Sequence, residues 1–375
     1  MRRLLYILTA VLVAGCVYPY NDALQTPDIP VYVFDGNISV GGEASLTISS
    51  MYGLDPSYRY STGKRQPDSW WVEDETGIRY FPPSISGKIN LHDAPADRKY
   101  RMVARIDEKI YSTAFRQPET PPQIDSINFS ADDENVYCSV SFSGGSDNSV
   151  YASVGIEEIW NFHAAFVQKI TLVAYPYLHI EDVDPYNNQQ NYWCWKQVKN
   201  EWETIVDFSK MGGKAEGLVV NTFRRKDNRN HREYIIRIRL RAIDREEYQF
   251  KKNLETLGQQ ANSLFTANPG DVASNVICET DPSERVLGFI STSRYTYKEA
   301  VLDNRYMIDW NPYLYTLVFV KQDVDVMTEY YNNGWLPVLK DFLDDAPVKV
   351  PFWGQARCVD CVADGGTLEK PTFSE

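Results

Sequence analysis

The amino-acid sequence predicts a mainly β protein, with an N-terminal β-sandwich (Ig-like) domain followed by a larger β-rich domain with one packed amphipathic helix. Apolar and polar residues alternate from Val31 to Ile48, and Gly36 and the pair Gly41-Gly42 interrupt this pattern. A period of two with glycine at the turns is typical of half-buried antiparallel strands. Further short strands are expected over 70–73, 77–81, 99–106 and 109–113. Several short strands separated by Pro- and Gly-containing turns favour a sandwich.

A proline-rich segment marks the expected domain boundary. Pro118, Pro121 and Pro122 lie within five residues of one another. Prolines hold a chain extended and remove the N–H groups that a sheet needs, so such a segment separates domains well. We therefore expect the sandwich over 30–117 and the β-rich domain over 118–375.

One amphipathic helix is predicted near 245–265 in the second domain. Asp244 is a good N-cap, and Glu247 three residues later completes a capping box. Apolar side chains then recur at helical spacing: Phe250, Leu254, Leu257, Ala261 and Leu264. A single apolar stripe predicts that this face of the helix packs on a sheet.

The N-terminus has the features of a lipoprotein signal peptide over residues 1–15. Arg2 and Arg3 precede an apolar run, and small residues stand directly before Cys16. The run is too short to span a bilayer. Cleavage would leave Cys16 as an acylated N-terminus, followed by a tether over 16–29. The alternative is a soluble secreted protein whose Cys16 merely lies near an ordinary cleavage site.

The charge of the chain excludes some partners. The whole chain has a net charge of −13, and loss of Arg2 and Arg3 with the signal peptide leaves 36 basic and 51 acidic residues, a net charge of −15. Phosphate backbones and anionic headgroups would repel such a chain, so no nucleic acid is expected. Contact with the membrane is expected through the N-terminal lipid alone.

No motif of a hydrolase, a metalloprotease or a phosphate-binding loop occurs in the sequence. We therefore expect a non-catalytic protein without a cofactor. The acidic segment 181–188 has oxygen ligands that suit calcium, but it lacks the glycine and terminal glutamate of an EF-hand loop. It is expected to face water, and no metal site is predicted.

The sequence contains five cysteines besides Cys16, so at least one of them stays unpaired within the chain. Cys358 and Cys361 have the spacing of a redox or half-zinc motif, and a structural disulfide between them is the preferred interpretation. Cys194 could equally pair with one member of this motif, and the sequence does not fix the connectivity.

Two clusters are candidates for contact with a partner or ligand. Aromatic residues gather at Tyr192, Trp193, Trp195 and Trp202. Such rings suit a sugar or a partner protein, although a core or disulfide-shielding cluster is the favoured alternative.

The second cluster is basic. Arg237, Arg239 and Arg241 alternate with apolar residues on one expected strand, and a basic loop over 224–232 precedes them. The row could bind an acidic ligand, but pairing with neighbouring carboxylates is favoured, and the loop is expected to be solvated.

Three segments are similar to a Bacteroidota outer-membrane lipoprotein family catalogued as domain of unknown function 4249. They are the helix region 243–254, the run 281–289 and the tail 358–373; Thr280–Ser283 departs from the family, which often carries Asn and Asp there. The resemblance implies a lipid-anchored protein of the outer membrane and the cell surface, partner to a TonB-dependent receptor in ligand capture or uptake. The alternatives are an envelope-assembly structural subunit or a hydrolase without a recognisable motif.

Overall fold

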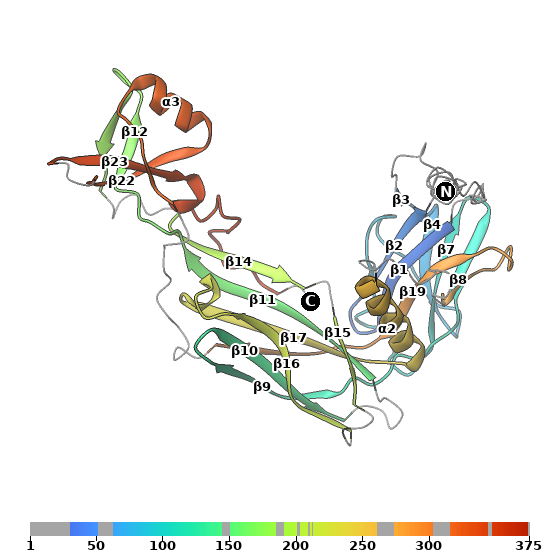
Figure 1. Cartoon of the computed structure of the whole chain (residues 1–375). Coiled ribbons are helices and arrows are strands. Elements are labelled where there is room, and N and C mark those ends of the chain that lie inside the picture. Colours follow the sequence, from blue (N-terminus) through green and yellow to red (C-terminus); the bar gives the residue numbers. More distant parts are fainter. Residues whose placement is uncertain are drawn as a thin grey trace, which may run out of the picture.

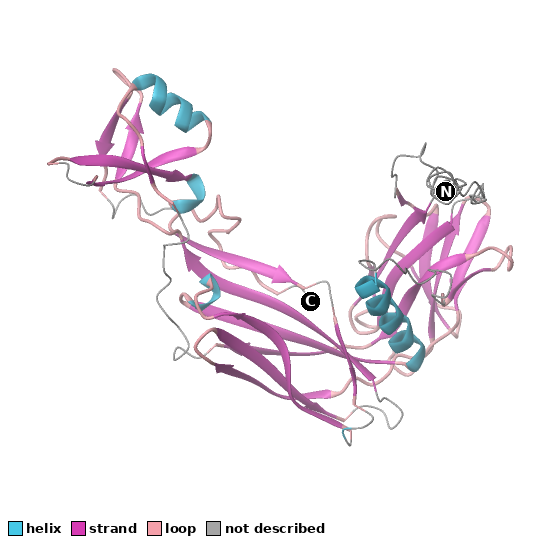
Figure 2. Cartoon of the chain, in the orientation of Figure 1, coloured by secondary structure: helices cyan, strands magenta, loops and turns pink. Residues whose placement is uncertain are grey.

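The computed structural model of the protein describes residues 31–51, 63–144, 151–184, 191–200, 203–208, 211, 213–260, 274–302, 316–343 and 347–373. These residues are mainly β, as the sequence predicts (Figure 2). They form an elongated, bent arrangement of an N-terminal body, a middle body and a small lobe (Figure 1). Each of the three has its own buried apolar cluster. Among the described helices, none is long and apolar enough to cross a membrane.

The N-terminal body has two sheets that share one core. The first sheet contains β1 (Val31–Ser39), β2 (Glu43–Met51), β3 (Lys64–Arg65), β6 (Ile89–Asn90) and β19 (Val286–Ser293). The second contains β4 (Ser69–Asp74), β5 (Arg79–Tyr80), β7 (Tyr100–Ile106), β8 (Lys109–Thr113) and β18 (Val276–Cys278). Phe34 and Ile48 from the first sheet pack with Trp70 and Tyr111 from the second. Burial of such side chains from both sheets holds the body together.

The expected division of the chain at residue 118 needs a correction. β19 pairs in parallel with β1, and β18 pairs with β8, so a segment from 276 to 293 completes the N-terminal body. Gly288 of β19 lies opposite Phe34 with a φ of +101°, and a Cβ there would lie 1.9 Å from the Phe34 carbonyl oxygen. Local alternation identifies a strand but not its partner, which is why the return of the chain was not expected.

The middle body also places two sheets around one core. One sheet contains β9 (Gln123–Ala131), β10 (Asn135–Ser143) and β16 (Lys214–Arg224). The other contains β11 (Tyr151–His163), β14 (Trp193–Lys199), β15 (Thr204–Asp207), β17 (Glu233–Ile243) and β20 (Thr296–Val301), and the short helix η2 (Asn228–Asn230) precedes β17. Ile236, Ile238 and Leu240 of β17 are buried in the core. The intervening arginines therefore lie on the opposite face of this sheet.

The small lobe lies at the far end of the middle body from the N-terminal body (Figure 1). It contains β12 (Ile170–Val173), β13 (His179–Asp182), β21 (Val318–Phe319), α3 (Val324–Asn332), β22 (Trp335–Phe342) and β23 (Lys349–Gln355), and the short helix η6 (Ala356–Cys358) follows. Val320, Met327 and Trp353 are the buried centre of the lobe. The sequence predicts the residues of this lobe as part of the second domain and not as a separate body.

Helix α2 (Arg245–Gln260) confirms the predicted helix, and its start is capped as expected. The Asp244 carboxylate accepts a hydrogen bond from the Glu247 N–H at 2.7 Å. Phe250 packs on Phe289 of β19, with 5.1 Å between ring centroids. Leu254, however, is 44% exposed, so the expectation that it packs on the sheet is wrong. Ala261 and Leu264, the last members of the predicted stripe, lie outside the described residues.

The same helix joins the N-terminal and middle bodies. It begins directly after β17 of the middle body, yet it packs beside β19 of the N-terminal body (Figure 1). Arg116, from the chain that leaves the N-terminal body, forms ion pairs with Asp244 and Glu246 at the start of the helix. These contacts fix the two bodies against each other beside the cleft described next.

Candidate functional site

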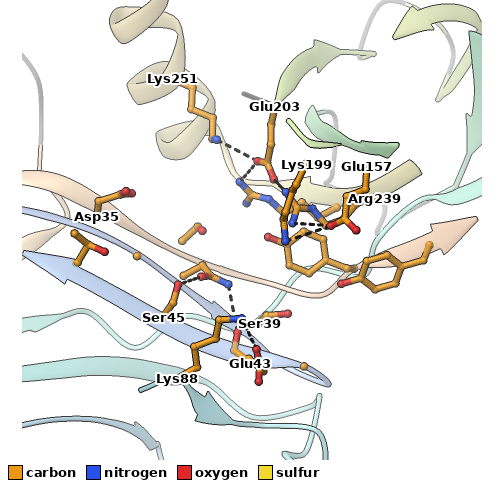
Figure 3. A pocket seen from close by; sticks show the side chains of 18 residues that line it. Asp35, Ser39, Glu43, Ser45, Lys88, Glu157, Lys199, Glu203, Arg239 and Lys251 are labelled. Atoms are coloured by element: carbon orange, nitrogen blue, oxygen red, sulfur yellow. Dashed lines mark hydrogen bonds and ion pairs between the residues drawn. The ribbon is translucent and has the colours of Figure 1, made fainter. Parts of the chain in front are cut away.

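A polar cleft of about 370 Å³ lies between the N-terminal and middle bodies (Figure 3). One wall comes from β1 and β2, and the other comes from the arginine-bearing face of the middle sheet together with α2. The lining includes five basic and four acidic side chains: Lys88, Lys199, Arg239, Arg241 and Lys251, with Asp35, Glu43, Glu157 and Glu203. Concave sites between bodies with convergent polar groups are common places for ligands.

The wall from the N-terminal body combines neutral hydrogen-bonding groups with three charged side chains, Asp35, Glu43 and Lys88. Because side chains alternate along a strand, burial of Phe34 and Ile48 in the core leaves Asn37, Ser45 and Thr47 on the cleft face. The Ser45 hydroxyl donates a hydrogen bond to the Asn37 side-chain oxygen at 2.6 Å. The alternation from Val31 to Ile48 predicted these outward positions, but not the wall that faces them.

The opposite wall is the arginine row of β17. In the register of β11 and β17, Arg241 lies opposite Ser153 and Arg239 lies opposite Gly155. A Cβ on Gly155 would lie 3.0 Å from the Arg239 Nη2 atom, so the glycine makes room for the guanidinium group. The alternation in β17 therefore sets the face on which the arginines lie, and Gly155 leaves space for the Arg239 side chain.

Carboxylates surround this row, as the favoured interpretation of the sequence expected. Arg241 Nη2 lies 2.8 Å from Glu203 and 2.6 Å from Glu247, and Arg239 lies 3.2 Å from Glu203. Arg237 pairs with Glu299 at 2.8 Å. The prediction of charge pairing is confirmed for all three arginines.

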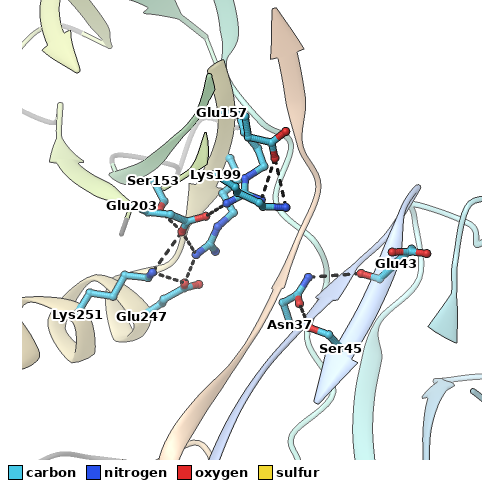
Figure 4. A network of polar contacts seen from close by, with 11 residues as sticks. Asn37, Glu43, Ser45, Ser153, Glu157, Lys199, Glu203, Glu247 and Lys251 are labelled. Carbon is cyan, nitrogen blue, oxygen red and sulfur yellow. Dashed lines mark hydrogen bonds and ion pairs between the residues drawn. The ribbon is translucent and has the colours of Figure 1, made fainter. Parts of the chain in front are cut away.

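Glu203 is the centre of this network (Figure 4). Besides the arginines, it contacts Lys251 at 3.2 Å and accepts a hydrogen bond from Ser153 at 2.5 Å. Burial by itself raises the pKa of Glu203, but the charges of Arg241 and Lys251 outweigh it and hold the pKa well below its usual range. Glu203 is therefore ionised at neutral pH and neutralises part of the positive charge of this wall.

Several polar atoms of this wall have no hydrogen-bond partner within the described part of the chain. They are Nε of Arg239, Nε and Nη1 of Arg241, and Oε2 of Glu157, all buried. Buried polar atoms are nearly always satisfied in native proteins, by protein, water or ligand. The wall therefore contains three donors and one acceptor that no described residue satisfies.

Two tyrosines complete the cleft. Tyr295 and Tyr297 stack with 5.9 Å between ring centroids. The guanidinium carbons of Arg239 and Arg241 lie 5.4 and 5.9 Å from the ring centroid of Tyr295, whereas Tyr297 is 46% exposed. Glu203 and both tyrosines were not predicted as site residues from the sequence. The two tyrosines are two residues apart, which places them on one face of a strand, but no local pattern indicates that they lie beside the arginine row.

The predicted aromatic contact residues lie elsewhere. Tyr192, Trp193 and Trp195 are half-buried around Cys194 on β14, and Trp202 is outside the described residues. Arg232 lies over the Trp193 ring, 5.2 Å from its centroid. The structure thus places these rings beside the disulfide rather than in the cleft.

The preferred disulfide between Cys358 and Cys361 is wrong. Cys361 is bonded to Cys194, with 5.7 Å between the Cα atoms, and Cys358 is a buried free thiol. The Cys361 N–H donates to the Asn191 carbonyl oxygen at 2.9 Å, which places this residue at the start of β14 beside Cys194. Cys358 Sγ instead lies beside Gly354 in β23.

The remaining predicted features are structural or lie outside the described residues. In the basic loop, Arg229 pairs with Glu158 at 2.8 Å. In the acidic segment, Asp182 pairs with Lys340, while residues 185–188 are not described. No cluster of metal-ligating side chains occurs among the residues that the structure describes. Cys16 also lies outside them.

A histidine pair predicts how stability depends on pH. The ring centroids of His163 and His231 lie 3.4 Å apart. Burial, together with the neighbouring His163, lowers the pKa of His231 to about 4. A histidine in the unfolded chain has a pKa near 6.5. Between pH 6.5 and pH 4 the unfolded chain therefore binds a proton at this position, whereas the folded chain does not. Stability consequently falls as the pH falls below about 6.5. We expect a loss of about 2 kcal/mol between pH 7 and 4.5 from this group.

The measurement is urea unfolding of the wild type and of His231→Gln at both pH values. The variant should lose less stability on acidification, because glutamine does not titrate. Equal losses in the two proteins would show that His231 is not the group responsible.

Comparison with known proteins gives one family. Residues 19–299, more than half of the 375-residue chain, match the family described as Domain of unknown function (DUF4249). No curated protein is similar enough to the chain to count as a match. The matched region includes α2, β19 and both walls of the cleft. The chain therefore belongs to the DUF4249 family.

Proposed function

We propose that this protein is an outer-membrane lipoprotein, anchored through Cys16, that serves a TonB-dependent receptor as a non-catalytic partner in ligand capture or uptake. The observation that carries this proposal is the N-terminal sequence, in which a basic head and an apolar run end in Ala14, Gly15 and Cys16. Small residues before such a cysteine suit cleavage and acylation there. Each buried lipid methylene contributes about 0.8 kcal/mol, so several acyl chains anchor a protein firmly.

The small lobe supports the part of the proposal that concerns a partner. Tyr175 and Tyr177, at the tip of the β12–β13 hairpin, are 86% and 68% exposed. Phe342 and Val348, near the tip of the β22–β23 hairpin, are also exposed. Exposed aromatic and apolar side chains that gather on one lobe are typical of protein contacts. Both tips point away from the middle body (Figure 1).

Anchoring makes a small contact surface sufficient. A lipid confines the protein to the membrane plane, so a receptor in the same membrane meets it at a high effective concentration. A modest interface through the hairpin tips would then hold the two proteins together. The cleft between the other two bodies stays available for a ligand in this arrangement.

The anchor is tested by growing cells with labelled palmitate. The full-length wild type should incorporate the label and sediment with the outer membrane, whereas Cys16→Ser should remain unlabelled and leave that fraction. The control is Cys138→Ser, which changes a thiol in the middle body and should keep the label. Incorporation of label into Cys16→Ser would overturn the proposed anchor.

The partner is tested by purifying the full lipoprotein from native membranes in mild detergent. We expect an outer-membrane barrel to co-purify in stoichiometric amount, and expect the double substitution of Tyr175 and Tyr177 by serine to reduce it at least tenfold. Tyr331→Ser is the matched control, because Tyr331 is exposed on α3 of the same lobe. Absence of any barrel from the wild-type preparation would contradict the proposal.

A further inference from the structure

We propose that the cleft binds an acidic sugar, meaning a ligand that combines a carboxylate with several neighbouring hydroxyl groups, as uronic acids do. This inference rests on the ligand-capture part of the proposed function and names the class of ligand. It is carried by the charge of the lining, the unpartnered donors of the arginine row and the hydroxyl-rich wall that faces them.

The charge of the cleft differs from that of the chain. The whole protein has 38 basic and 51 acidic residues, whereas the lining has five basic and four acidic side chains. An otherwise acidic surface would repel an anion, so the balance in the cleft makes it a favourable place for one. With Glu247, which pairs with Arg241, the charges of this network balance, so a carboxylate meets less repulsion here than over the acidic surface.

Donors for this carboxylate stand in the arginine wall. Nε and Nη1 of Arg241 and Nε of Arg239 are buried without a partner among the described residues. Hydrogen bonds from a guanidinium group to a carboxylate are short and strong, and more so where water is excluded. Lys199 and Lys251, which line the same wall, add positive charge nearby (Figure 3).

Groups that suit sugar hydroxyls stand around these donors. Asn37, Ser45 and Thr47 from the opposite wall both donate and accept hydrogen bonds. The Glu157 carboxylate, which lines the cleft, can accept a bond from a hydroxyl. The half-exposed ring of Tyr297 gives an apolar face on which the C–H face of a sugar ring can pack. A simple dicarboxylate would use the arginine wall but leave these groups unused.

The binding experiment uses the full-length acylated protein in detergent micelles and isothermal titration calorimetry. Three probes are compared: digalacturonate, neutral digalactose and succinate. We expect digalacturonate to bind at least tenfold more tightly than either of the others. Equal affinity for digalacturonate and succinate would show an anion site that does not recognise the sugar. Equal affinity for the two sugars would show that the carboxylate does not contribute to binding. Either result, or no binding at all, overturns the inference.

Matched variants locate the ligand. Lys251→Gln and Tyr297→Ala should each weaken digalacturonate binding about tenfold, because both side chains line the cleft. Lys252→Gln is the control: it is the next residue on α2, is exposed and pairs with Glu255. Thermal unfolding confirms that each variant is folded. An equal loss in Lys251→Gln and Lys252→Gln would place the ligand elsewhere and overturn the inference.

Failure of this inference and failure of the proposed function give different results. If a barrel co-purifies with the protein but digalacturonate does not bind, the receptor partnership stands and the ligand class is wrong. If digalacturonate binds in the cleft but no barrel co-purifies, the ligand class stands and the receptor partnership is wrong.

Discussion

Replacing both Cys194 and Cys361 with alanine should lower the free energy of unfolding by about 5 kcal/mol. The disulfide joins residues that are 167 positions apart in the sequence. A cross-link that closes so long a loop removes much conformational freedom from the unfolded chain, and this is the source of the expected effect. The loop includes β18 and β19 of the N-terminal body and β21 to β23 of the small lobe, so its release loosens all three parts.

The control for this prediction is Cys358→Ala. Cys358 is also a buried cysteine, but it is free, so its loss should cost no more than about 2 kcal/mol. The double variant is preferred to Cys194→Ala alone, because a lone Cys361 thiol would lie three residues from Cys358. Denaturant unfolding at pH 7 gives the energies, and mass spectrometry of peptides from the oxidised wild type gives the connectivity. A peptide that links Cys358 to Cys361 would contradict the prediction.

The features that the sequence predicts well are those set by local alternation. The strands at 31–39 and 43–51, the direction of the arginine row in β17 and the cap of α2 at Asp244 all follow from neighbouring residues. Pairing of the arginines with carboxylates also follows, because a buried guanidinium group needs an anion whatever the fold. These features needed no knowledge of distant segments.

The features that were missed depend on contacts between remote parts of the chain. Tyr32 pairs with Val286 in the parallel β1–β19 ladder, and no local sequence pattern predicts a partner so far along the chain. Cys361 lies three residues from Cys358 in sequence, yet the fold brings Cys194 beside it. The cleft is the clearest case. Glu203 precedes a short strand without a distinctive pattern. It contacts Arg241 and Lys251 only because the fold brings the middle sheet and α2 together.

Replacing Arg241 with methionine should have the second largest effect, a loss of about 3 kcal/mol of folding stability. The Arg241 side chain is 3% exposed, and its partners Glu203 and Glu247 are also buried. Removing the guanidinium group leaves Glu247 without its closest cation and leaves Glu203 with Arg239 and Lys251 only. A buried carboxylate that loses its partner retains the full cost of desolvation.

Arg237→Met is the matched control on the same strand. Arg237 pairs with Glu299, which is half exposed, so water can solvate this carboxylate after the substitution. We expect a loss of about 1 kcal/mol or less. Urea unfolding of the two variants and the wild type at pH 7 measures the difference. Equal losses would show that burial of the Arg241 network does not govern its contribution.

Acidification distinguishes the loss of charge pairing from the loss of packing. In the folded protein, burial raises the pKa of Glu203, but the charges of Arg241 and Lys251 lower it by more, so the pKa is depressed. Its contribution to stability is therefore present above the unfolded-state pKa of about 4.5 and declines as the pH falls below that value. Without Arg241 the depression is smaller, so the wild type should lose more stability than Arg241→Met between pH 5 and pH 3. Groups that titrate equally in both proteins, His231 among them, cancel in this difference. If the gap between the two proteins stayed constant over this range, the methionine variant would be losing packing rather than the electrostatic support of Glu203.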